Sequence, residues 1–398
     1  MNERHLLRPS NSSMQGQHLE TEFLKSEPYF IWVLAPHLET DDPSLQHFYD
    51  FEANMAEFTK AFAELNLPWK WQVVTLNDYK KVIDHISESI NGHIPIVFNL
   101  CDGDEVNNTP GISVLRYLEE KQLIYTGARE AYYHLTTSKI TMKEAFDEAG
   151  IATPPWLAIT NPDQDLHGFC EKVGLPVIVK PAVSGGSMGL GLKNVVNNDD
   201  ELKKIVTELY RGYHGWDFTF GGLIAEKFIA GQEFTSFLVG SYDQPGSGIV
   251  FQPVERVFSD RLPENEKFLS FERLWETYEE EKPCENAAGE YEDFYNYFLP
   301  AKELEKEICQ LSWDAFCAVQ GTGYSRVDLR MDKDTGKFYV LEVNAQCGLS
   351  EDENYTSIGG MVRLGKDGFS DMLKAILENA LATKMKDKAA VTRKAFTK

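Results

Sequence analysis

Ser325-Arg326-Val327-Asp328-Leu329-Arg330-Met331 and Phe338-Tyr339-Val340-Leu341-Glu342-Val343 are two predicted β-strands near the end of the chain. Asp334-Thr335-Gly336 lies between them and is typical of a hairpin turn. Side chains alternate along a strand, so every second residue points to the same face. The two stretches therefore predict a hairpin that gathers its polar side chains in one place.

The polar ends of this predicted hairpin suit a metal ion. Arg326 and Asp328 share one face of the first strand, and Glu342 and Asn344 share one face of the second. Two carboxylates and an amide oxygen are hard ligands that fit Mg²⁺ bound to a triphosphate. The alternative is a surface strand pair with polar ends. The neighbouring residues are apolar, however, and burying unpaired charges is costly.

A glycine-rich run follows the predicted strand Pro176 to Pro181. It reads Ser184-Gly185-Gly186-Ser187-Met188-Gly189-Leu190-Gly191. Glycines let backbone N–H groups approach a phosphate closely, and Lys180 adds a positive charge just before the run. The run matches neither the Walker loop nor the Rossmann fingerprint. Taken by itself it is equally compatible with a flexible turn.

A third candidate is Glu226-Lys227-Phe228-Ile229, followed by Glu233. The backbone of this segment could run along an adenine edge, and Glu233 could accept hydrogen bonds from ribose hydroxyls. The alternative is an ordinary strand–turn–strand with exposed acids.

Composition limits the possible partners and the setting of the chain. The 398 residues carry a net charge of −23, which argues against nucleic acid or an anionic membrane as a partner. None of the six cysteines has a CxxC or zinc-type spacing, so we expect a reduced, cytoplasmic setting. No apolar run approaches the length of a membrane span. Polar residues 1–25 and basic residues 384–398 are both expected to be disordered tails.

The order of expected elements predicts a mixed α/β (α+β) protein of three units. Strands near residues 30–35, 71–75 and 95–100 alternate with helices, which is typical of a parallel α/β domain. The expected units are an N-terminal substrate domain, a central lobe and a C-terminal lobe with the metal and catalytic site, at residues 26–135, 136–222 and 223–383. The long acidic segment 258–300 within the last unit suggests a functional lid.

Together these motifs resemble those of D-alanine–D-alanine ligase and its ATP-grasp relatives over nearly the full chain. Further matching segments are Tyr125-Thr126-Gly127, Ser138-Lys139, Gly150 to Pro155, Leu175 to Pro181, Gly231-Gln232-Glu233, Tyr297 to Ala301 and Gly348. The resemblance implies a two-lobed ATP-grasp fold after the N-terminal domain. It also implies an ATP-dependent ligase that activates a carboxylate as an acyl phosphate, joins it to an amine and releases ADP and phosphate.

The resemblance also implies a role for each matching residue. Lys139 and Lys180 would hold the ATP phosphates, under a loop formed by Ser184, Gly185, Gly186, Ser187 and Gly189. The nucleotide would be flanked by Glu226, Lys227, Phe228, Ile229, Glu233 and Leu341. Asp328, Glu342 and Asn344 would carry Mg²⁺, or Mn²⁺. Arg326, Gly348 and Ser187 would act in catalysis, and Glu39, Ser357 and Trp275 would contact substrate. The implied partners are a small carboxylate and an amine, amino acids among them, and a second copy of the chain in a homodimer.

The substrate half departs from the ligase pattern, whereas the nucleotide half keeps it. Gly186 stands where the family has a serine, Leu274 and Trp275 replace a lysine and a tyrosine, and Cys347 replaces a proline. With Phe268 and Phe271 nearby, these changes suggest a larger or more apolar substrate than D-alanine. No histidine lies in a motif that would activate Cys347, so we interpret this residue as a packing or substrate-lining group.

Two other functions remain open at this level. One is an ATP-grasp kinase or activating enzyme with a different acceptor. The other is a regulatory protein that binds nucleotide without catalysis, although the complete set of charged motif residues argues against it.

Overall fold

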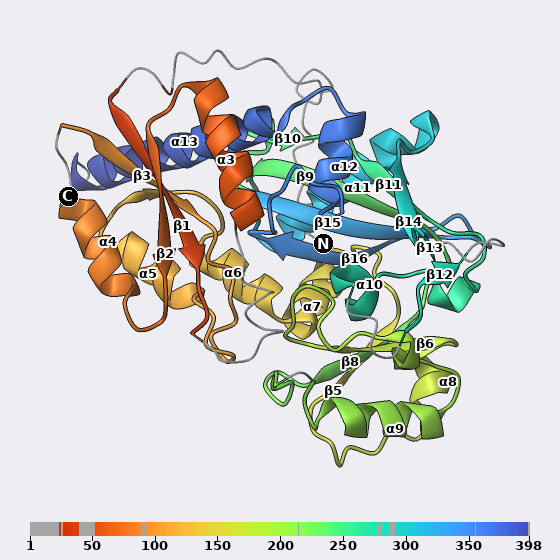
Figure 1. Cartoon of the computed structure of the whole chain (residues 1–398). Helices are drawn as coiled ribbons and strands as arrows, with labels where there is room; N and C mark the ends of the chain where they lie inside the picture. Colours follow the sequence, from red (N-terminus) through yellow and green to blue (C-terminus); the bar gives the residue numbers. More distant parts are fainter. Residues whose placement is uncertain are drawn as a thin grey trace.

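The computed structural model describes residues 24, 27–39, 52–88, 92–213, 215–276, 281–285, 291–354 and 356–396. Within them the strands form three larger sheets and one two-stranded ribbon. Figure 1 shows the N-terminal domain beside the C-terminal sheet, with the central lobe below them. The mixed α/β fold expected from the sequence is thus confirmed. Of residues 1–25 the structure describes only Leu24, which is buried. The expectation that this segment is disordered therefore stays a prediction.

The N-terminal domain is built on a parallel sheet, as the alternating strands and helices predicted. Its strand order is β2-β1-β3-β4, and every pair is parallel. The elements are β1 (Tyr29–Pro36), α3 (Glu52–Leu65), β2 (Trp69–Val74), α4 (Tyr79–Glu88), β3 (Ile94–Asn99), α5 (Ile112–Glu120), β4 (Ile124–Tyr125) and α6 (Glu130–Thr137). Because parallel strands end at one edge, the loops after β1 and β3 open on the same side of the domain.

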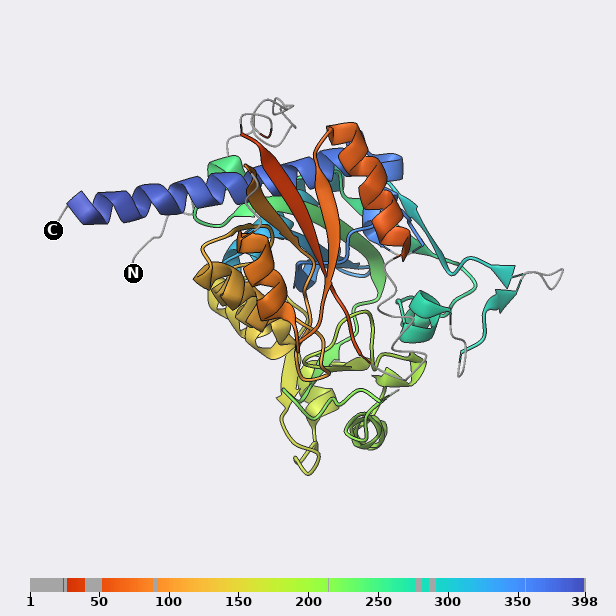
Figure 2. The ribbon, with the colours of Figure 1, turned by 60° about the vertical axis from the view of Figure 1, so that its left-hand side comes forward.

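One face of this sheet is covered by the last helix of the chain, α13 (Phe369–Phe396). Ile31 and Phe98 of the sheet belong to one core cluster with Phe58 of α3 and with Phe369 and Leu373 of α13. The opposite face packs against α4 and α5. Figure 2 shows α13 passing behind the sheet, with its C-terminal end projecting beyond the other elements. The N-terminal and C-terminal parts of the chain thus share a single core.

The expectation that residues 384–398 form a disordered tail was wrong for most of this segment. Helix α13 continues through it as far as Phe396. Alanine and lysine, which are frequent here, are good helix formers. A helix already nucleated on the core also extends at little further cost. None of the helices that the structure describes is long and apolar enough to cross a membrane.

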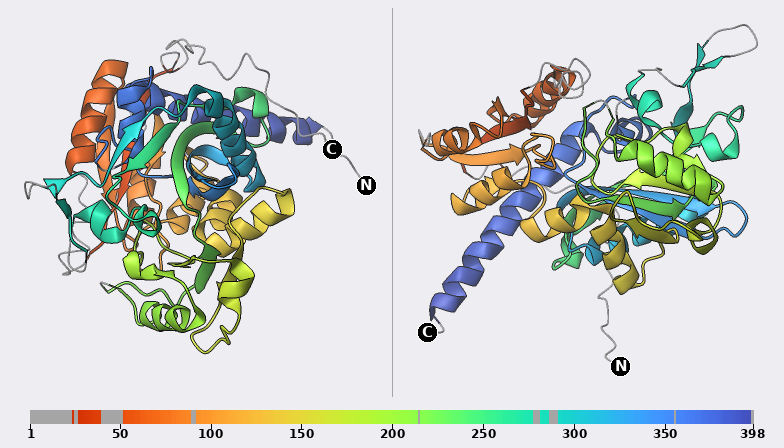
Figure 3. Two further views of the ribbon diagram at one scale, coloured as in Figure 1. Left: turned by 90° about the vertical axis from the view of Figure 1, so that its right-hand side faces the viewer. Right: turned by 90° about the horizontal axis from the view of Figure 1, so that it is seen from below.

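The central lobe is an antiparallel sheet in the order β5-β8-β6-β7, seen from two more sides in Figure 3. Its elements are α7 (Lys139–Ala149), β5 (Trp156–Ile159), α8 (Phe169–Val173), β6 (Val177–Pro181), β7 (Val195–Val196), α9 (Asp199–Leu209) and β8 (Leu223–Lys227). The sequence placed the end of this lobe at residue 222, yet β8 pairs with β5 and β6 inside it. Gly221 and Gly222, both at positive φ, turn the chain back into the sheet, so this lobe extends through Lys227.

The C-terminal lobe is a second antiparallel sheet, ordered β14-β11-β9-β15-β16, with β10 also paired to β9. Its elements are β9 (Gly231–Ser241), β10 (Ile249–Val250), β11 (Val254–Phe258), α10 (Phe271–Trp275), β12 (Cys284–Glu285), β13 (Tyr291–Glu292), β14 (Tyr295–Phe298), α11 (Lys302–Ala318), β15 (Thr322–Asp332), β16 (Phe338–Ala345) and α12 (Ser357–Leu364). Strands β15 and β16 form the hairpin predicted from the sequence. Residues 277–280 and 286–290 of the expected lid lie outside the described part.

Candidate active site

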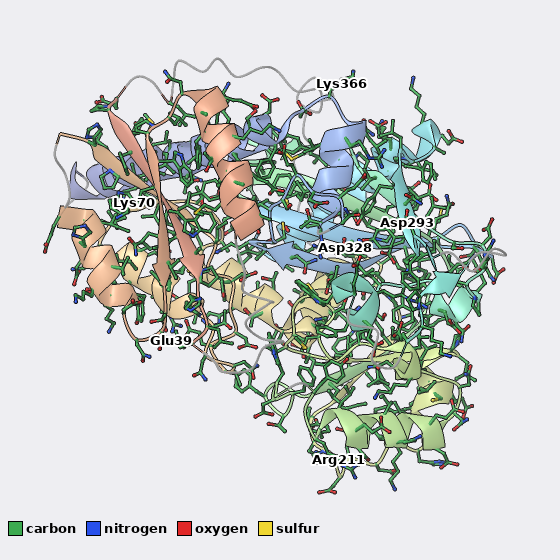
Figure 4. The ribbon with its side chains drawn as sticks, in the orientation of Figure 1. Glu39, Lys70, Arg211, Asp293, Asp328 and Lys366 are labelled. Atoms are coloured by element: carbon green, nitrogen blue, oxygen red, sulfur yellow. The ribbon has the colours of Figure 1, made fainter. Side chains whose placement is uncertain are left out.

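A cavity of about 430 Å³ lies where the N-terminal domain and the two lobes meet. Residues from each of the three units line this cavity. Asp328, one of the lining residues, is labelled near the centre of the molecule in Figure 4. Nearly all residues singled out in the sequence line it: Lys139, Lys180, Ser184, Gly185, Gly186, Ser187, Glu226, Lys227, Phe228, Ile229, Glu233, Trp275, Arg326, Asp328, Leu341, Glu342, Asn344, Gly348 and Ser357. The fold therefore collects in one cavity residues that lie more than 200 positions apart.

Two of the residues singled out are not among those lining the cavity. Glu39 lies at the periphery of the N-terminal domain (Figure 4), where it is exposed and accepts a hydrogen bond from Asn77 at 3.1 Å. Gly189 packs instead against Phe218, and a Cβ atom on Gly189 would stand 2.7 Å from that ring. Glycine is therefore needed here for close packing of the loop, and Glu39 is not brought to the other candidate substrate residues.

The hairpin places its polar residues in two directly opposed pairs. Arg326 is opposite Asn344, and Asp328 is opposite Glu342. The Asn344 amide nitrogen donates to Asp328 at 3.0 Å and to Glu342 at 3.2 Å. The remaining Asp328 oxygen accepts from Thr235 on β9 at 2.9 Å. Two carboxylates and one amide thus converge on the cavity, which is a donor set of the kind that binds Mg²⁺.

The electrostatics of this pair differ between the two acids. Burial raises the pKa of Asp328 against the opposing attraction of Arg326. Burial also disfavours charge on Glu342, but Lys139 and Arg326 outweigh it and lower the pKa of Glu342. Within the described residues there is no group of three or more His, Cys, Asp or Glu suited to a metal ion. A metal here would consequently depend on two carboxylates and Asn344, with other ligands from a bound nucleotide.

Three lysines surround the buried Glu226 or lie close to it. The carboxylate of Glu226 on β8 forms ion pairs with the ammonium groups of Lys180 at 2.5 Å and Lys143 at 2.7 Å. Burial opposes its ionisation, but the two lysines prevail and lower the pKa of Glu226 to about 2. Lys139, one turn before Lys143 on α7, lies 3.9 Å from Glu342 and donates to the Ser184 carbonyl at 3.0 Å. Lys139 and Lys180 therefore stand between the glycine loop and the two opposed carboxylates.

Glu233 is held between two arginines that the sequence reading missed. Arg330 donates to one of its oxygens at 3.0 and 2.7 Å, and Arg256 pairs with the other. Arg330 also donates to the Ile229 carbonyl at 2.8 Å and lies over the Phe228 ring. Both arginines line the cavity. Nothing in their local sequence marked them, because the contacts depend on how β9 pairs with β11 and β15.

Part of the expected lid, residues 268–276, packs against the glycine loop. Ser187 donates to the Leu269 carbonyl, and the Trp275 indole N–H donates to the Gly186 carbonyl, both at 2.9 Å. Arg273, which is buried, pairs with Glu281 at 3.2 Å, and Glu281 accepts from the Leu192 backbone at 3.2 Å. The segment containing α10 therefore rests on the loop and covers this side of the cavity.

The remaining end of the cavity is formed by the chain after β16. Gln346, at a positive φ, donates to the Cys101 carbonyl at 3.0 Å and accepts from the Ala128 backbone at 3.1 Å. Burial raises the pKa of the Cys347 thiol to about 12, so it is protonated near neutral pH. Ser357 is buried at the start of α12, and its hydroxyl has no hydrogen-bond partner among the described residues. This end thus offers backbone and hydroxyl groups but no activated nucleophile.

This combination of an N-terminal parallel domain and two antiparallel lobes around a charged cavity is the ATP-grasp fold. Residues 145–377 match the family model described as D-ala D-ala ligase C-terminus. The chain is 32% identical to D-alanine–D-alanine ligase B of Xanthomonas campestris over 258 residues. This matched stretch covers 64% of this chain and 69% of that protein. The chain therefore belongs to the D-alanine–D-alanine ligase family and is an ATP-dependent carboxylate–amine ligase.

Solved structures have the same fold. The D-alanine–D-alanine ligase from Bacillus anthracis superimposes with a TM-score of 0.60 at 18% identity, covering 90% of this chain and 99% of that one. A second structure of that enzyme, complexed with ATP, gives a TM-score of 0.59 at 17% identity over the same shares of the two chains. The ligase from Coxiella burnetii gives 0.59 at 17% identity, covering 93% and 99%.

Proposed function

We propose that this chain binds ATP with Mg²⁺, or Mn²⁺, in the described cavity, converts a carboxylic acid into an acyl phosphate and transfers the acyl group to an amine. The observation that carries this proposal is the convergence of Asp328, Glu342 and Asn344 with Lys139 and Lys180. Asp328, Glu342 and Asn344 would hold the metal ion, which would supply positive charge to offset the negative charge that develops on the transferring phosphoryl group. ADP and phosphate are the expected products beside the new amide.

The protein's own groups divide the reaction between them. Lys139 and Lys180 neutralise the triphosphate beneath the glycine loop, where Ser187 holds the lid carbonyl at Leu269. Arg326 lies 3.0 Å from Asp328 and can still offer a cationic face to the acyl oxygen. The Gly348 backbone N–H would serve the same oxygen. Preorganised donors of this kind act most strongly where charge develops in the transition state.

Adenine and ribose would occupy the end near the start of β9. The Ile229 carbonyl already accepts a hydrogen bond from Arg330. The adenine edge would therefore form hydrogen bonds with the Ile229 N–H and with the backbone carbonyls of the residues before it. Phe228 and Leu341 would flank the ring. Both Glu233 oxygens have arginine partners, and the ribose hydroxyls would have to share that carboxylate with Arg256 and Arg330. Glu226, paired with two lysines, is assigned to holding the phosphate-binding Lys180 in place.

We infer that the substrates are amino acids or similar small molecules, and that D-alanine is not the preferred acid. The Trp275 N–H is already bonded to the Gly186 carbonyl, so Trp275 presents an apolar ring to the cavity, together with Leu274 and the tyrosines of β14, Tyr295 and Tyr297. Phe268 lines the cavity as well, whereas Phe271 is buried in the central lobe. Ser357 is assigned to the carboxylate of the amine substrate.

Two further expectations concern the setting of the protein. We infer a cytoplasmic location from the reduced cysteines, since Cys101, Cys170, Cys309, Cys317 and Cys347 are all free thiols. We also infer a homodimer, supported by exposed apolar side chains on β11 (Val257), on β14 (Phe298) and directly after β14 (Leu299). Light scattering on the purified protein tests the second expectation.

The test of the function is ADP release measured with a panel of acids, in the presence and absence of amines. D-alanine is compared with L-amino acids, with aromatic and branched side chains, and with acids that lack an amino group. Hydroxylamine traps the acyl phosphate as a hydroxamate, which separates activation from transfer. ADP release with no hydroxamate and no amide product would contradict the proposed reaction. Preferential use of D-alanine at both positions would contradict the substrate assignment.

A further inference from the structure

The chain directly after β16 forms one wall of the catalytic cavity. This segment, residues 346–350, is called the acyl wall because it contains the Gly348 N–H assigned to the acyl oxygen. All of its residues line the cavity: Gln346, Cys347, Gly348, Leu349 and Ser350. Strand β16 ends at Ala345, so the hydrogen-bond ladder of the sheet does not extend into the acyl wall. The position of this wall therefore depends on other contacts.

The Gln346 side chain connects the acyl wall to the N-terminal domain. It is 1% exposed. Its Nε2 donates to the Cys101 carbonyl at 3.0 Å, and its Oε1 accepts from the Ala128 N–H at 3.1 Å. A flipped amide would place oxygen against oxygen and nitrogen against nitrogen, so these two backbone groups specify its orientation. One side chain thus joins the C-terminal lobe to two separate loops of the N-terminal domain.

The backbone on both sides of this contact is shaped for it. Gln346 has a φ of 50°, a left-handed conformation that is uncommon for residues other than glycine. Opposite it, Gly127 has a φ of 97°, and a Cβ atom on Gly127 would lie 2.8 Å from the Gln346 side chain. Glycine at this position therefore provides the space that the glutamine occupies. An unfavourable backbone conformation persists only where its surroundings hold it, and the two buried hydrogen bonds supply that hold.

Helix α3 of the same domain holds the other end of the acyl wall. Asn54 donates to the Leu349 carbonyl at 2.8 Å, and Glu57 accepts from the Ser350 hydroxyl at 2.7 Å. Asn54 and Glu57 are three positions apart and therefore share one face of the helix. The acyl wall thus belongs to the C-terminal lobe by sequence but is fixed to the N-terminal domain by its contacts.

The nucleotide end of the cavity is built differently. The segment from Glu226 to Glu233, proposed to contact adenine and ribose, runs from β8 of the central lobe to β9 of the C-terminal lobe. Among the described residues, the N-terminal domain contributes four to the cavity lining: Ala53, Asn54, Leu100 and Asp102. A small shift of this domain against the lobes would therefore alter the acyl end and leave the nucleotide end unchanged.

We propose that Gln346 is a positioning residue, whose two hydrogen bonds hold the acyl wall against the N-terminal domain and keep the Gly348 N–H where charge develops on the acyl oxygen. The inference rests on the proposed function. A displacement of about 1 Å is enough to lose much of the benefit of orientation. The same contact closes the seam between domain and lobe, and a seam without it would admit water to the acyl phosphate.

The experiment compares the full-length wild-type enzyme with Gln346→Gly and Gln346→Met. Glycine suits the left-handed backbone but removes the side chain, whereas methionine keeps the length of the side chain but forms neither hydrogen bond. A defect that both variants share is therefore due to the lost hydrogen bonds. Gln320→Gly is the matched control, because Gln320 also has a positive φ, of 57°, but is exposed just after α11.

For both Gln346 variants we expect kcat for amide formation to fall about 10-fold. The ratio of ADP to amide should rise a few-fold, because water competes with the amine for the acyl phosphate. The KM for ATP and the increase in Tm given by Mg·ATP should match those of the wild-type enzyme. Asn54→Ala, which removes the bond to the Leu349 carbonyl, should change kcat and the ratio in the same direction by a smaller factor.

Two results would overturn the proposal. One is a wild-type kcat and a wild-type ratio of ADP to amide in both Gln346 variants. The other is a rise in the KM for ATP as large as the fall in kcat, which would indicate a general loss of the folded site. Hydroxamate formation by the wild-type enzyme tests the proposed function separately, because that measurement involves no variant.

Discussion

Asp328 on β15 and Glu342 on β16 are directly opposed across an antiparallel strand pair, and the amide of Asn344 donates to both. Like charges placed opposite each other in a sheet repel, and burial strengthens this repulsion. Arg326 pairs with Asp328 at 3.0 Å but reaches Glu342 only at 4.0 Å. Lys139, at 3.9 Å, also compensates Glu342, whose pKa is lowered. Burial keeps the pKa of Asp328 raised, so the charge of Asp328 is the one that the chain compensates incompletely.

Replacing Glu342, or the Asn344 amide that donates to both acids, should remove metal-dependent activity and keep the fold. For Glu342→Gln and Asn344→Ala we expect turnover to fall by at least about 100-fold, because electrostatic stabilisation of the transferring phosphoryl group is lost. The increase in Tm that Mg·ATP gives the wild-type enzyme should shrink in both variants. Without ligand, the Tm of Glu342→Gln should stay equal or rise slightly because repulsion is relieved, whereas that of Asn344→Ala should fall because both carboxylates lose a donor. Glu303→Gln, on the exposed start of α11, is the control. Near-full activity of either variant at low Mg²⁺ would refute the ligand assignment.

The contact between lid and glycine loop should control how well the acyl phosphate is shielded from water. Trp275→Phe keeps an aromatic ring but loses the indole N–H that donates to Gly186. We expect ADP release without amide product to increase a few-fold, since a looser lid admits water. The ratio of ADP to amide measures this. Hydrogen exchange of residues 184–191 and 264–276 should also slow when Mg·ATP and substrates bind, and identical exchange in both states would contradict the assignment of a lid.

Arg330 should influence ATP binding through Glu233. In Arg330→Lys the positive charge remains, but the two-pronged contact with Glu233 and the bond to the Ile229 carbonyl are lost. We expect the KM for ATP to rise about 10-fold, with the KM for the acid nearly unchanged. Arg211→Lys, on an exposed turn of the central lobe, serves as the matched control. Equal changes in both KM values would assign Arg330 a purely structural role.

Glu226 should make stability depend on pH in the acid range. Its pKa of about 2 lies below the ordinary 4.5, so its contribution is complete above pH 4.5 and is lost as the pH falls toward 2. Between pH 6 and pH 3 the free energy of unfolding of the wild-type protein should drop by about 2 kcal/mol more than that of Glu226→Gln. Denaturant unfolding at the two pH values measures this difference. Parallel decreases in the two proteins would show that the Lys143–Glu226–Lys180 group does not have this effect.

Local patterns predicted the hairpin and the meeting of its polar side chains. Alternation along two strands and one turn were enough to bring Asp328 and Glu342 together, because only a short loop separates them. Ser138 and Gly150 likewise mark the two ends of α7, where they cap the helix. The order of strands and helices in the N-terminal domain also indicated its parallel sheet. These features depend on neighbouring residues, and the sequence carries that information directly.

Features that depend on distant pairing were missed or misplaced. Arg256 and Arg330 reach Glu233 only because β11 and β15 flank β9, and no local pattern encodes that order. β10 and β11 are two separate strands rather than one continuous strand, since Pro253 between them lacks the N–H needed to continue the ladder. Glu39 was assigned to the substrate because of the resemblance to the ligase family, but its side chain accepts a hydrogen bond from Asn77. Orientation at a loop is decided by contacts that a single sequence does not reveal.

The covering of the first sheet by α13 has a consequence for biosynthesis. Phe58, Phe62 and Phe98 emerge from the ribosome long before Phe369 and Leu373, which pack against them. The nascent N-terminal domain must therefore keep an apolar surface exposed to water during most of translation, a state that favours aggregation or chaperone binding. A chain cut before α13 would remain in that state permanently. Emergence of α13 is thus the event that completes the core shared by the two parts of the chain.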